Sequence, residues 1–184
     1  QGDRLRESVR LVEARDGQRF ATVTALIALH EALFHDNALV LMLAPAQRQS
    51  QELFLKLKAH INNVATLPAE IVEESSLKLT LSNGSRVVTL PGDEKTIRGY
   101  SGVSLIVCDE ASRIPDALYY AVRPMLAVSK GRIFLLSTPF GKRGFFHHEW
   151  HEGGPDWHRV KVTARDCPRI TAEWLESERQ TIGD

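Results

Sequence analysis

A short apolar stretch that ends in two acids constrains the fold of this chain more than any other feature. Leu105 to Cys108 are consecutive apolar residues, and Asp109 and Glu110 follow directly. A continuous apolar run of this length is typical of a strand covered on both faces. Because acidic residues are poor strand formers, we expect the strand to end here with two carboxylates at its carboxyl end. Ligands of open α/β sheets bind at that end.

The rest of the chain alternates between strand and helix patterns. We predict strands at 9–14, 38–43, 105–108, 132–137 and 157–164 (the last nearer the sheet edge), and helices from Thr22 to about 35 and at 47–64, 114–128, 144–152 and 171–182. We expect 15–21 to be a loop and Thr171 to cap the last helix. Residues 77–81 and 86–90 alternate around Asn83-Gly84, which indicates an antiparallel hairpin. The order predicts an α/β fold: a mainly parallel sheet with helices on both faces and a hairpin insertion.

Composition limits the kinds of protein that the chain can be. Its 184 residues suffice for one domain with a sizeable core. Lys plus Arg and Asp plus Glu are both 23, so a DNA-contacting surface must be a local patch. Two cysteines, Cys108 and Cys167, form no disulfide framework or zinc spacing, which is typical of a reducing compartment. We find no signal peptide or membrane-crossing run, and we expect one domain excised from a longer protein.

Polar side chains end a second apolar strand in the same way. Ser137 and Thr138 follow the apolar run 133–136. If the two strands are neighbours, these hydroxyls and the carboxylates of Asp109 and Glu110 face one crevice. Paired acids there suit a magnesium nucleotide, one holding the ion and the next orienting or deprotonating water, while hydroxyls suit phosphate oxygens. A solvated acidic turn and a capped Ser-Thr-Pro turn are the structural alternatives.

Several segments, taken in order, carry a resemblance to a known family. They are Ala-Pro-Ala-Gln-Arg-Gln-Ser-Gln-Glu-Leu-Phe (44–54), Thr-Ile-Arg-Gly (96–99), Leu-Ile-Val-Cys-Asp-Glu-Ala-Ser (105–112), Leu-Leu-Ser-Thr-Pro-Phe-Gly (135–141), Gly-Phe-Phe (144–146) and Asp-Cys-Pro-Arg-Ile (166–170). Together they resemble the ATPase domain of the phage or prophage terminase large subunit, the motor that pumps DNA into a procapsid. The segment 105–112 looks like its Walker B motif and 135–141 like its coupling motif. The resemblance implies a P-loop NTPase-like fold.

The resemblance implies a role for each matching residue. Asp109 would hold Mg²⁺, Glu110 would activate the attacking water, and Ser137 and Thr138 would couple the nucleotide state to movement. Arg98 would complete a neighbouring subunit's site in a ring, although a surface loop arginine is the alternative. The implied cofactors are ATP and Mg²⁺. The implied partners are duplex DNA, the portal and the small terminase subunit, in the cytoplasm of the infected bacterial host and without a membrane.

The phosphate-binding loop is where the sequence departs from the family. Such a loop needs Gly-x-x-x-x-Gly-Lys-[Ser/Thr], so that backbone N–H groups cradle the phosphates and the lysine neutralises their charge. Residues 14–22 read Ala-Arg-Asp-Gly-Gln-Arg-Phe-Ala-Thr. One register sets Phe20 at the lysine position and the other sets Ala21 there, so neither has a lysine. An altered loop, a degenerate family member that kept the fold, or remaining residues that suffice would each explain the departure.

Four residues of this stretch are left as candidates for nucleotide contact. They are Arg15, Gly17, Arg19 and Thr22. Either arginine could reach a phosphate, although Asp16 would repel it, and a helix that starts at Thr22 would attract an anion. We therefore expect weak nucleotide affinity and little hydrolysis.

The function that follows is ATP hydrolysis in this crevice, driving a lever that pushes duplex DNA. We expect residues 1–184 to form a single ATPase domain without the nuclease domain that follows it in such subunits, and hence no DNA cleavage. Two alternatives stay open. One is a helicase-like P-loop ATPase, which would usually need a second motor domain. The other is a catalytically silent fold that binds a partner or assembles with other subunits.

Two basic clusters have structural alternatives. His147 and His151 lie one helical turn apart and could bind an adventitious metal, but the His-Glu-x-x-His pattern of zinc enzymes is missing. Lys142 and Arg143 could touch a DNA backbone. A solvated helix face and a charged turn are the corresponding alternatives.

Overall fold

The computed structural model describes residues 9–14, 17–64, 66–92, 97, 99–166 and 170–182. Its strands are β1 (Val9–Ala14), β2 (Leu39–Ala44), β3 (Ile71–Glu74), β4 (Lys78–Leu81), β5 (Arg86–Pro91), β6 (Leu105–Cys108), β7 (Arg132–Ser137) and β8 (Trp157–Val162). Its helices are α1 (Gly17–Phe34), α2 (Gln47–Asn62), α3 (Asp116–Val122), α4 (Gly144–His151) and α5 (Ala172–Ile182), with the 3-10 turns η2 (Ala111–Arg113), η3 (Arg123–Leu126) and η4 (Ala164–Asp166). In the described residues, no helix is both long and apolar enough to span a membrane.

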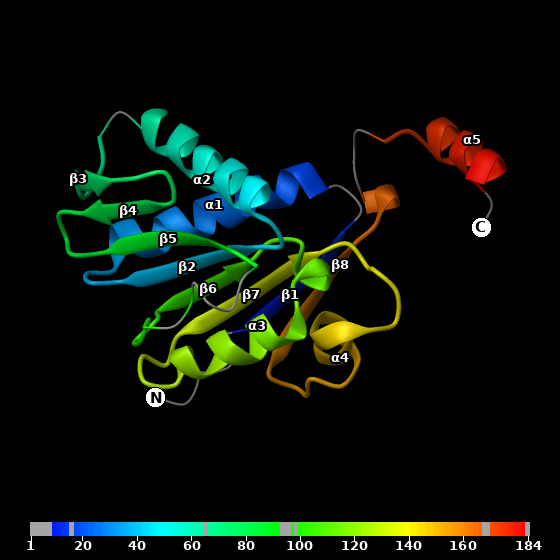
Figure 1. The fold of residues 1–184 in the computed structure, drawn as a ribbon. Helices are drawn as coiled ribbons and strands as arrows, with labels where there is room; N and C mark the ends of the chain where they lie inside the picture. Colours follow the sequence, from blue (N-terminus) through cyan, green and yellow to red (C-terminus); the bar gives the residue numbers. More distant parts are fainter. Residues whose placement is uncertain are drawn as a thin grey trace.

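The strands form one mainly parallel sheet in the order β3-β4-β5-β2-β6-β7-β1-β8 (Figure 1). The predicted α/β class is therefore confirmed, and β8 lies at the edge as expected. The hairpin of β4 and β5 is antiparallel, and β5 continues the sheet by pairing in parallel with β2. The edge strand β3 was not predicted. All its residues are exposed and half of them are glutamates, so it has no apolar pattern to detect.

Helices cover both faces of the sheet (Figure 1). Successive residues of β2 point to opposite faces, as strand geometry requires. Leu41 and Leu43 join a core cluster with α3 and α4, whereas Val40 and Met42 join a second cluster with α1 and α2. Because each fully buried Leu or Val contributes about 1.5–3 kcal/mol, the central strands are a rigid base for whatever lies at their ends.

The helix after β1 begins earlier than predicted. The apolar pattern indicated a start at Thr22 and a loop at 15–21, but α1 begins at Gly17. The prediction was wrong because residues 17–20 (Gly-Gln-Arg-Phe) lack helical apolar spacing. The predicted helix at 114–128 is also shorter, since α3 gives way to η3 at Arg123, next to Pro124. Proline has no N–H to donate to the carbonyl four residues earlier, so the α-helical hydrogen-bond pattern is interrupted at Pro124.

A buried carboxylate ties the α3, α4 and β8 elements together. Glu149 of α4 is 4% exposed. It accepts hydrogen bonds from Tyr119 Oη (2.8 Å), Arg123 Nη1 (2.5 Å) and Trp157 Nε1 (2.6 Å). Burial, followed by the hydrogen bond to Glu149, raises the pKa of the Tyr119 hydroxyl well above its usual range, so it stays protonated as a donor. Trp157 itself is buried in the core.

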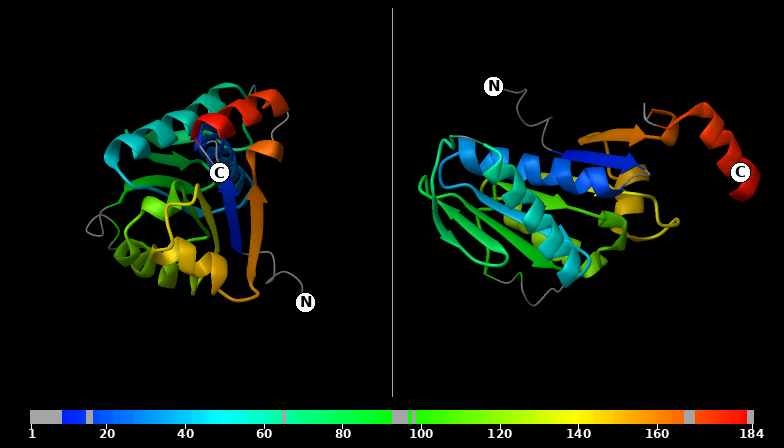
Figure 2. Two further views of the ribbon diagram at one scale, coloured as in Figure 1. Left: turned by 90° about the vertical axis from the view of Figure 1, so that its right-hand side faces the viewer. Right: turned by 90° about the horizontal axis from the view of Figure 1, so that it is seen from above.

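The end of the described chain stands apart from these layers. In Figures 1 and 2, α5 lies beyond the edge of the sheet and away from the other helices. Its start agrees with the prediction, because the Trp174 N–H donates to Thr171 Oγ1 at 3.2 Å. A side-chain acceptor at this position satisfies one of the free N–H groups of the first turn.

Candidate functional site

The two polar strand ends meet at one edge of the sheet, as predicted. β6 and β7 are adjacent and parallel, with Cys108 level with Leu135. Asp109 and Glu110 therefore leave the sheet beside Ser137 and Thr138. β1 lies on the other side of β7, with Glu13 level with Ser137, so β1 ends at the same edge.

Hydroxyl groups join the ends of β6 and β7. Ser137 is 3% exposed, and its Oγ accepts a hydrogen bond from the Ser112 N–H at 3.0 Å. The Ser137 hydroxyl lies 2.7 Å from Ser112 Oγ, and Ser112 Oγ donates to the Thr138 carbonyl at 2.9 Å. These hydrogen bonds connect the turn after β6 directly to the turn after β7. This arrangement favours a linking role for Ser137 over direct contact with a ligand.

Asp109 is a half-buried carboxylate whose ionisation is disfavoured. Its N–H donates to the Leu43 carbonyl at 2.9 Å, which aligns the strand end with β2. Burial, and secondarily the charge of Glu110, raises the pKa of Asp109 to about 6, against the weaker opposing effects of the Glu110 N–H and Lys56. A cation at this carboxylate would relieve both causes, so the site favours positive charge.

Two neighbouring side chains restrict the rotation of the Glu110 side chain. Its Oε2 accepts a hydrogen bond from Gln49 Nε2 at 3.0 Å and lies 3.7 Å from Arg113 Nε. Its backbone is left-handed, with φ 49°. This conformation costs a residue with a Cβ about 1–2 kcal/mol, and such strain is concentrated at functional sites. Gln49 was not predicted as a site residue, although it lies in the segment 44–54 that carried the family resemblance.

The stretch expected to contact phosphates is mostly helical. Gly17 is the first residue of α1 and Arg19 lies in its first turn, whereas Arg15 lies outside the described residues. Only two residues separate the end of β1 from α1. The free N–H groups of the helix start therefore belong to 17–20. Thr22 is half-buried in the second turn, so the expectation of a helix N-terminus at Thr22 is corrected.

Metal-binding potential is concentrated at Asp109. Among the described residues, no group of three or more His, Cys, Asp or Glu side chains could hold a metal ion. Magnesium in nucleotide sites needs only one or two carboxylates, because water and phosphates supply the other ligands. Asp109 fits that requirement. The rings of His147 and His151 are adjacent, with centroids 4.4 Å apart, but without a third ligand in the described part of the chain.

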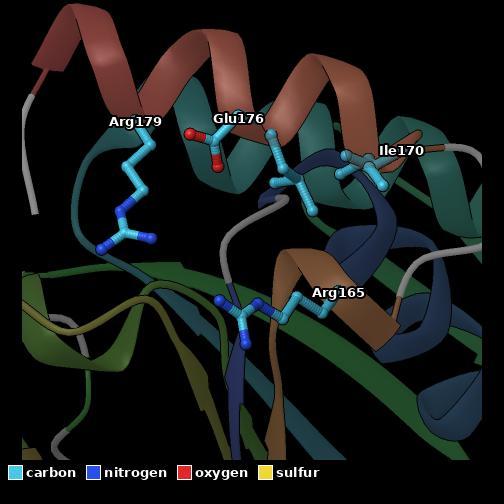
Figure 3. Close-up of a pocket in the computed structure, with 6 residues that line it drawn as sticks. Arg165, Ile170, Glu176 and Arg179 are labelled. Carbon is cyan, nitrogen blue, oxygen red and sulfur yellow. The ribbon is translucent and has the colours of Figure 1, made fainter.

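A further predicted site residue lies outside the described part of the chain, and one hollow of the structure lies away from the predicted site. Arg98 lies outside the described residues. A hollow of about 380 Å³ beside α5 is lined by Arg165 of η4, by Ile170, and by Glu176 and Arg179 of α5 (Figure 3). None of the predicted site residues lines it.

A phage terminase large subunit is similar to this chain in sequence. The probable terminase large subunit of Enterobacteria phage P7 is 23% identical over 193 residues, which cover 94% of this chain and 38% of that protein. The chain thus spans well under half the length of this relative. No protein-family model matches the chain.

Solved structures with the same fold are large terminases. The Thermus phage P74-26 large terminase ATPase domain matches with a TM-score of 0.78 at 18% identity, over 100% of this chain and 86% of that one. The large terminase of a thermophilic bacteriophage matches with a TM-score of 0.76 at 11% identity, over 100% and 48%. The HK97 bacteriophage large terminase matches with a TM-score of 0.70 at 14% identity, over 96% and 40%. The resemblance drawn from the sequence motifs is confirmed.

Proposed function

From a fold and a sequence that both match the ATPase domain of phage large terminases, we propose that this chain is the motor domain of a DNA-packaging machine. It would bind Mg-ATP at the edge where β1, β6 and β7 end, and couple hydrolysis to the translocation of duplex DNA. The observation that carries the proposal is the linkage of the two strand ends, Asp109-Glu110 and Ser137-Thr138, through Ser112. The large terminase of the thermophilic bacteriophage is known in complexes with ADP and with ATP-γ-S, which supports a nucleotide site in this fold.

Each residue has a distinct role in this proposal. Asp109, the acid of a Walker B pair, would hold Mg²⁺, which when bound would neutralise phosphate charge. Glu110 would orient and deprotonate water, with Gln49 holding it in place. Ser137 and Thr138 would pass the change at the site to β7, and Arg98 would reach the site of an adjacent subunit. In the whole protein, this domain would work as a ring on the procapsid, with the portal and the small subunit, in the host cytoplasm.

We further propose that nucleotide binding is impaired as the sequence stands. The segment that should cradle phosphates has no lysine in either register. The segment between β1 and α1 is only two residues long, which is shorter than the loop that a Gly-x-x-x-x-Gly-Lys motif forms before its helix. Arg15, Gly17, Arg19 and the free N–H groups at the start of α1 would be the remaining phosphate contacts.

Calorimetric titration with Mg-ATP tests this proposal. The chain itself is expected to bind weakly, and the triple variant Arg19→Gly, Phe20→Lys and Ala21→Ser is expected to bind more tightly and to hydrolyse ATP. Adding Glu110→Gln to the triple variant is the matched control, because it should retain binding and lose hydrolysis. If neither the chain nor the triple variant binds ATP at millimolar concentration, the proposed enzyme activity is wrong for this chain.

A second function is favoured by the same loop. The missing lysine and the helical path from Gly17 fit a catalytically silent terminase-like fold that acts as an assembly or binding module. That function predicts that restoring the loop yields no hydrolysis while the fold is unchanged. The triple variant therefore distinguishes the two functions.

A further inference from the structure

A second hollow lies beside the candidate site, on the opposite face of the sheet from α1. It measures about 550 Å³ and is lined by residues of η2, by the start of α3, and by the segment between β7 and α4. Ser112, which links the strand ends, is one of its lining residues. The hollow therefore adjoins the turns after β6 and β7 without containing Asp109 or Glu110.

Two arginines converge on one aromatic ring in this hollow. The guanidinium carbons of Arg113 and Arg143 lie 4.3 Å and 5.0 Å from the centre of the Phe140 ring. Both arginines are exposed, and Phe140 is 39% exposed. An exposed cation–π contact contributes about 0.5–1 kcal/mol and holds each guanidinium in place. Two positive groups on one ring repel each other, and an anion that binds both would reduce that repulsion.

The charges around the hollow favour an anion. Within the described part of the chain, no carboxylate pairs with Arg143 or with the adjacent Lys142. Asp116 is the one carboxylate among the described residues that line the hollow. Its Oδ1 accepts the Phe145 N–H at 2.8 Å, which holds it at the start of α4. Its single negative charge leaves an excess of positive charge from Arg113, Lys142 and Arg143. Arg113 contacts both the Phe140 ring and the candidate site, because its Nε also lies 3.7 Å from Glu110 Oε2. In a chain with no net charge, this is a local basic patch of the kind that DNA contact would require.

Arginine is suited to phosphate, because its planar fork donates two parallel hydrogen bonds to phosphate oxygens. The hollow is not the expected position of ATP phosphates, since α1 lies with α2 on the other face of the sheet (Figure 1). We propose that Arg113 and Arg143, set on Phe140, bind a phosphate of the duplex DNA backbone. The choice of DNA as the source of phosphate rests on the proposed packaging function.

Fluorescence anisotropy with a short labelled duplex, without nucleotide, tests the site. Arg143 is the residue to change, because Arg113 also contacts the catalytic carboxylate. Arg143→Ala is expected to weaken binding about tenfold at about 50 mM salt and to make the salt dependence shallower by about one counterion. Arg143→Lys should keep most of the salt dependence while binding more weakly than the wild type. Arg86→Ala, at an exposed arginine on β5, is the matched control and should bind like the wild type.

Several results would overturn the proposal. The first is that the wild type does not bind the duplex at low salt. The second is that Arg143→Ala binds the duplex with the same affinity as the wild type. The third is that Arg86→Ala loses as much affinity for the duplex as Arg143→Ala does. If Arg143→Ala lowers ATP affinity but not DNA affinity, the hollow binds nucleotide phosphate instead. If it changes only the oligomeric state, the hollow binds an acidic segment of a second copy. Because the DNA assay contains no ATP, a failure of nucleotide binding leaves its outcome interpretable.

Discussion

Replacement of Asp109 by asparagine should stabilise the metal-free protein at neutral pH. The folded protein raises the pKa of Asp109 from 3.8 to about 6, because burial and the charge of Glu110 oppose ionisation. Above pH 6 the folded state therefore holds a disfavoured charge that the unfolded chain carries freely. The difference of about two pKa units corresponds to about 3 kcal/mol of lost stability. Asparagine has no such charge, so Asp109→Asn should recover up to this amount.

The pH dependence distinguishes this cause from an ordinary packing effect. Urea unfolding in EDTA should show the full gain above pH 6, a shrinking gain as the pH falls toward 4, and none below, where the aspartic acid is protonated in both states. Mg²⁺ should stabilise the wild type more than the variant if Asp109 holds the ion. A variant that is less stable at pH 7.5, or a gain that does not change with pH, would refute the reasoning.

Asp166 supplies a control of opposite sign. Hydrogen bonds from the Thr163 hydroxyl and N–H lower the pKa of Asp166, so its contribution to stability is present at neutral pH and is lost as the pH falls. Asp166→Asn should therefore destabilise the protein at neutral pH and have little effect in acid. Both variants replace one aspartate by asparagine, and only the environment of the carboxylate differs.

Two further predictions concern side chains that support the site. In the triple variant with the restored loop, Gln49→Ala should lower kcat about tenfold, because it removes a positioning contact to Glu110. The ATP affinity measured by calorimetry should stay the same. A change in affinity alone would show that Gln49 acts on binding instead. Glu149→Ala should lower the free energy of unfolding in urea by about 3 kcal/mol, because it leaves two buried donors, Tyr119 Oη and Trp157 Nε1, and the half-exposed Arg123 guanidinium without their acceptor. A loss below about 1 kcal/mol would mean that water replaces the carboxylate.

The positions of β6 and β7 were predictable because they depend on local patterns, whereas their adjacency entered the prediction only as a condition that the structure then met. The runs that form β6 and β7 are continuous and apolar and end in polar residues, so the pattern itself marks their ends. The partners within the site were not predictable in this way. Gln49 reaches Glu110 across 61 positions of the chain, and nothing in the spacing of either residue indicates that hydrogen bond. The role of Ser112 likewise depends on the turn geometry that faces it toward Ser137.

The acids of the candidate site are positioned by residues of neighbouring strands and of α2. The Asp109 N–H donates to the Leu43 carbonyl of β2, and Glu110 accepts a hydrogen bond from Gln49 of α2. Ser112 joins the turn after these acids to Ser137 of β7. Because these contacts involve neither Arg19 nor Phe20, we expect substitutions at those two positions to change phosphate affinity while the hydrogen bonds of Asp109 and Glu110 are kept. We therefore expect the triple variant with the restored loop to find the two carboxylates already in place.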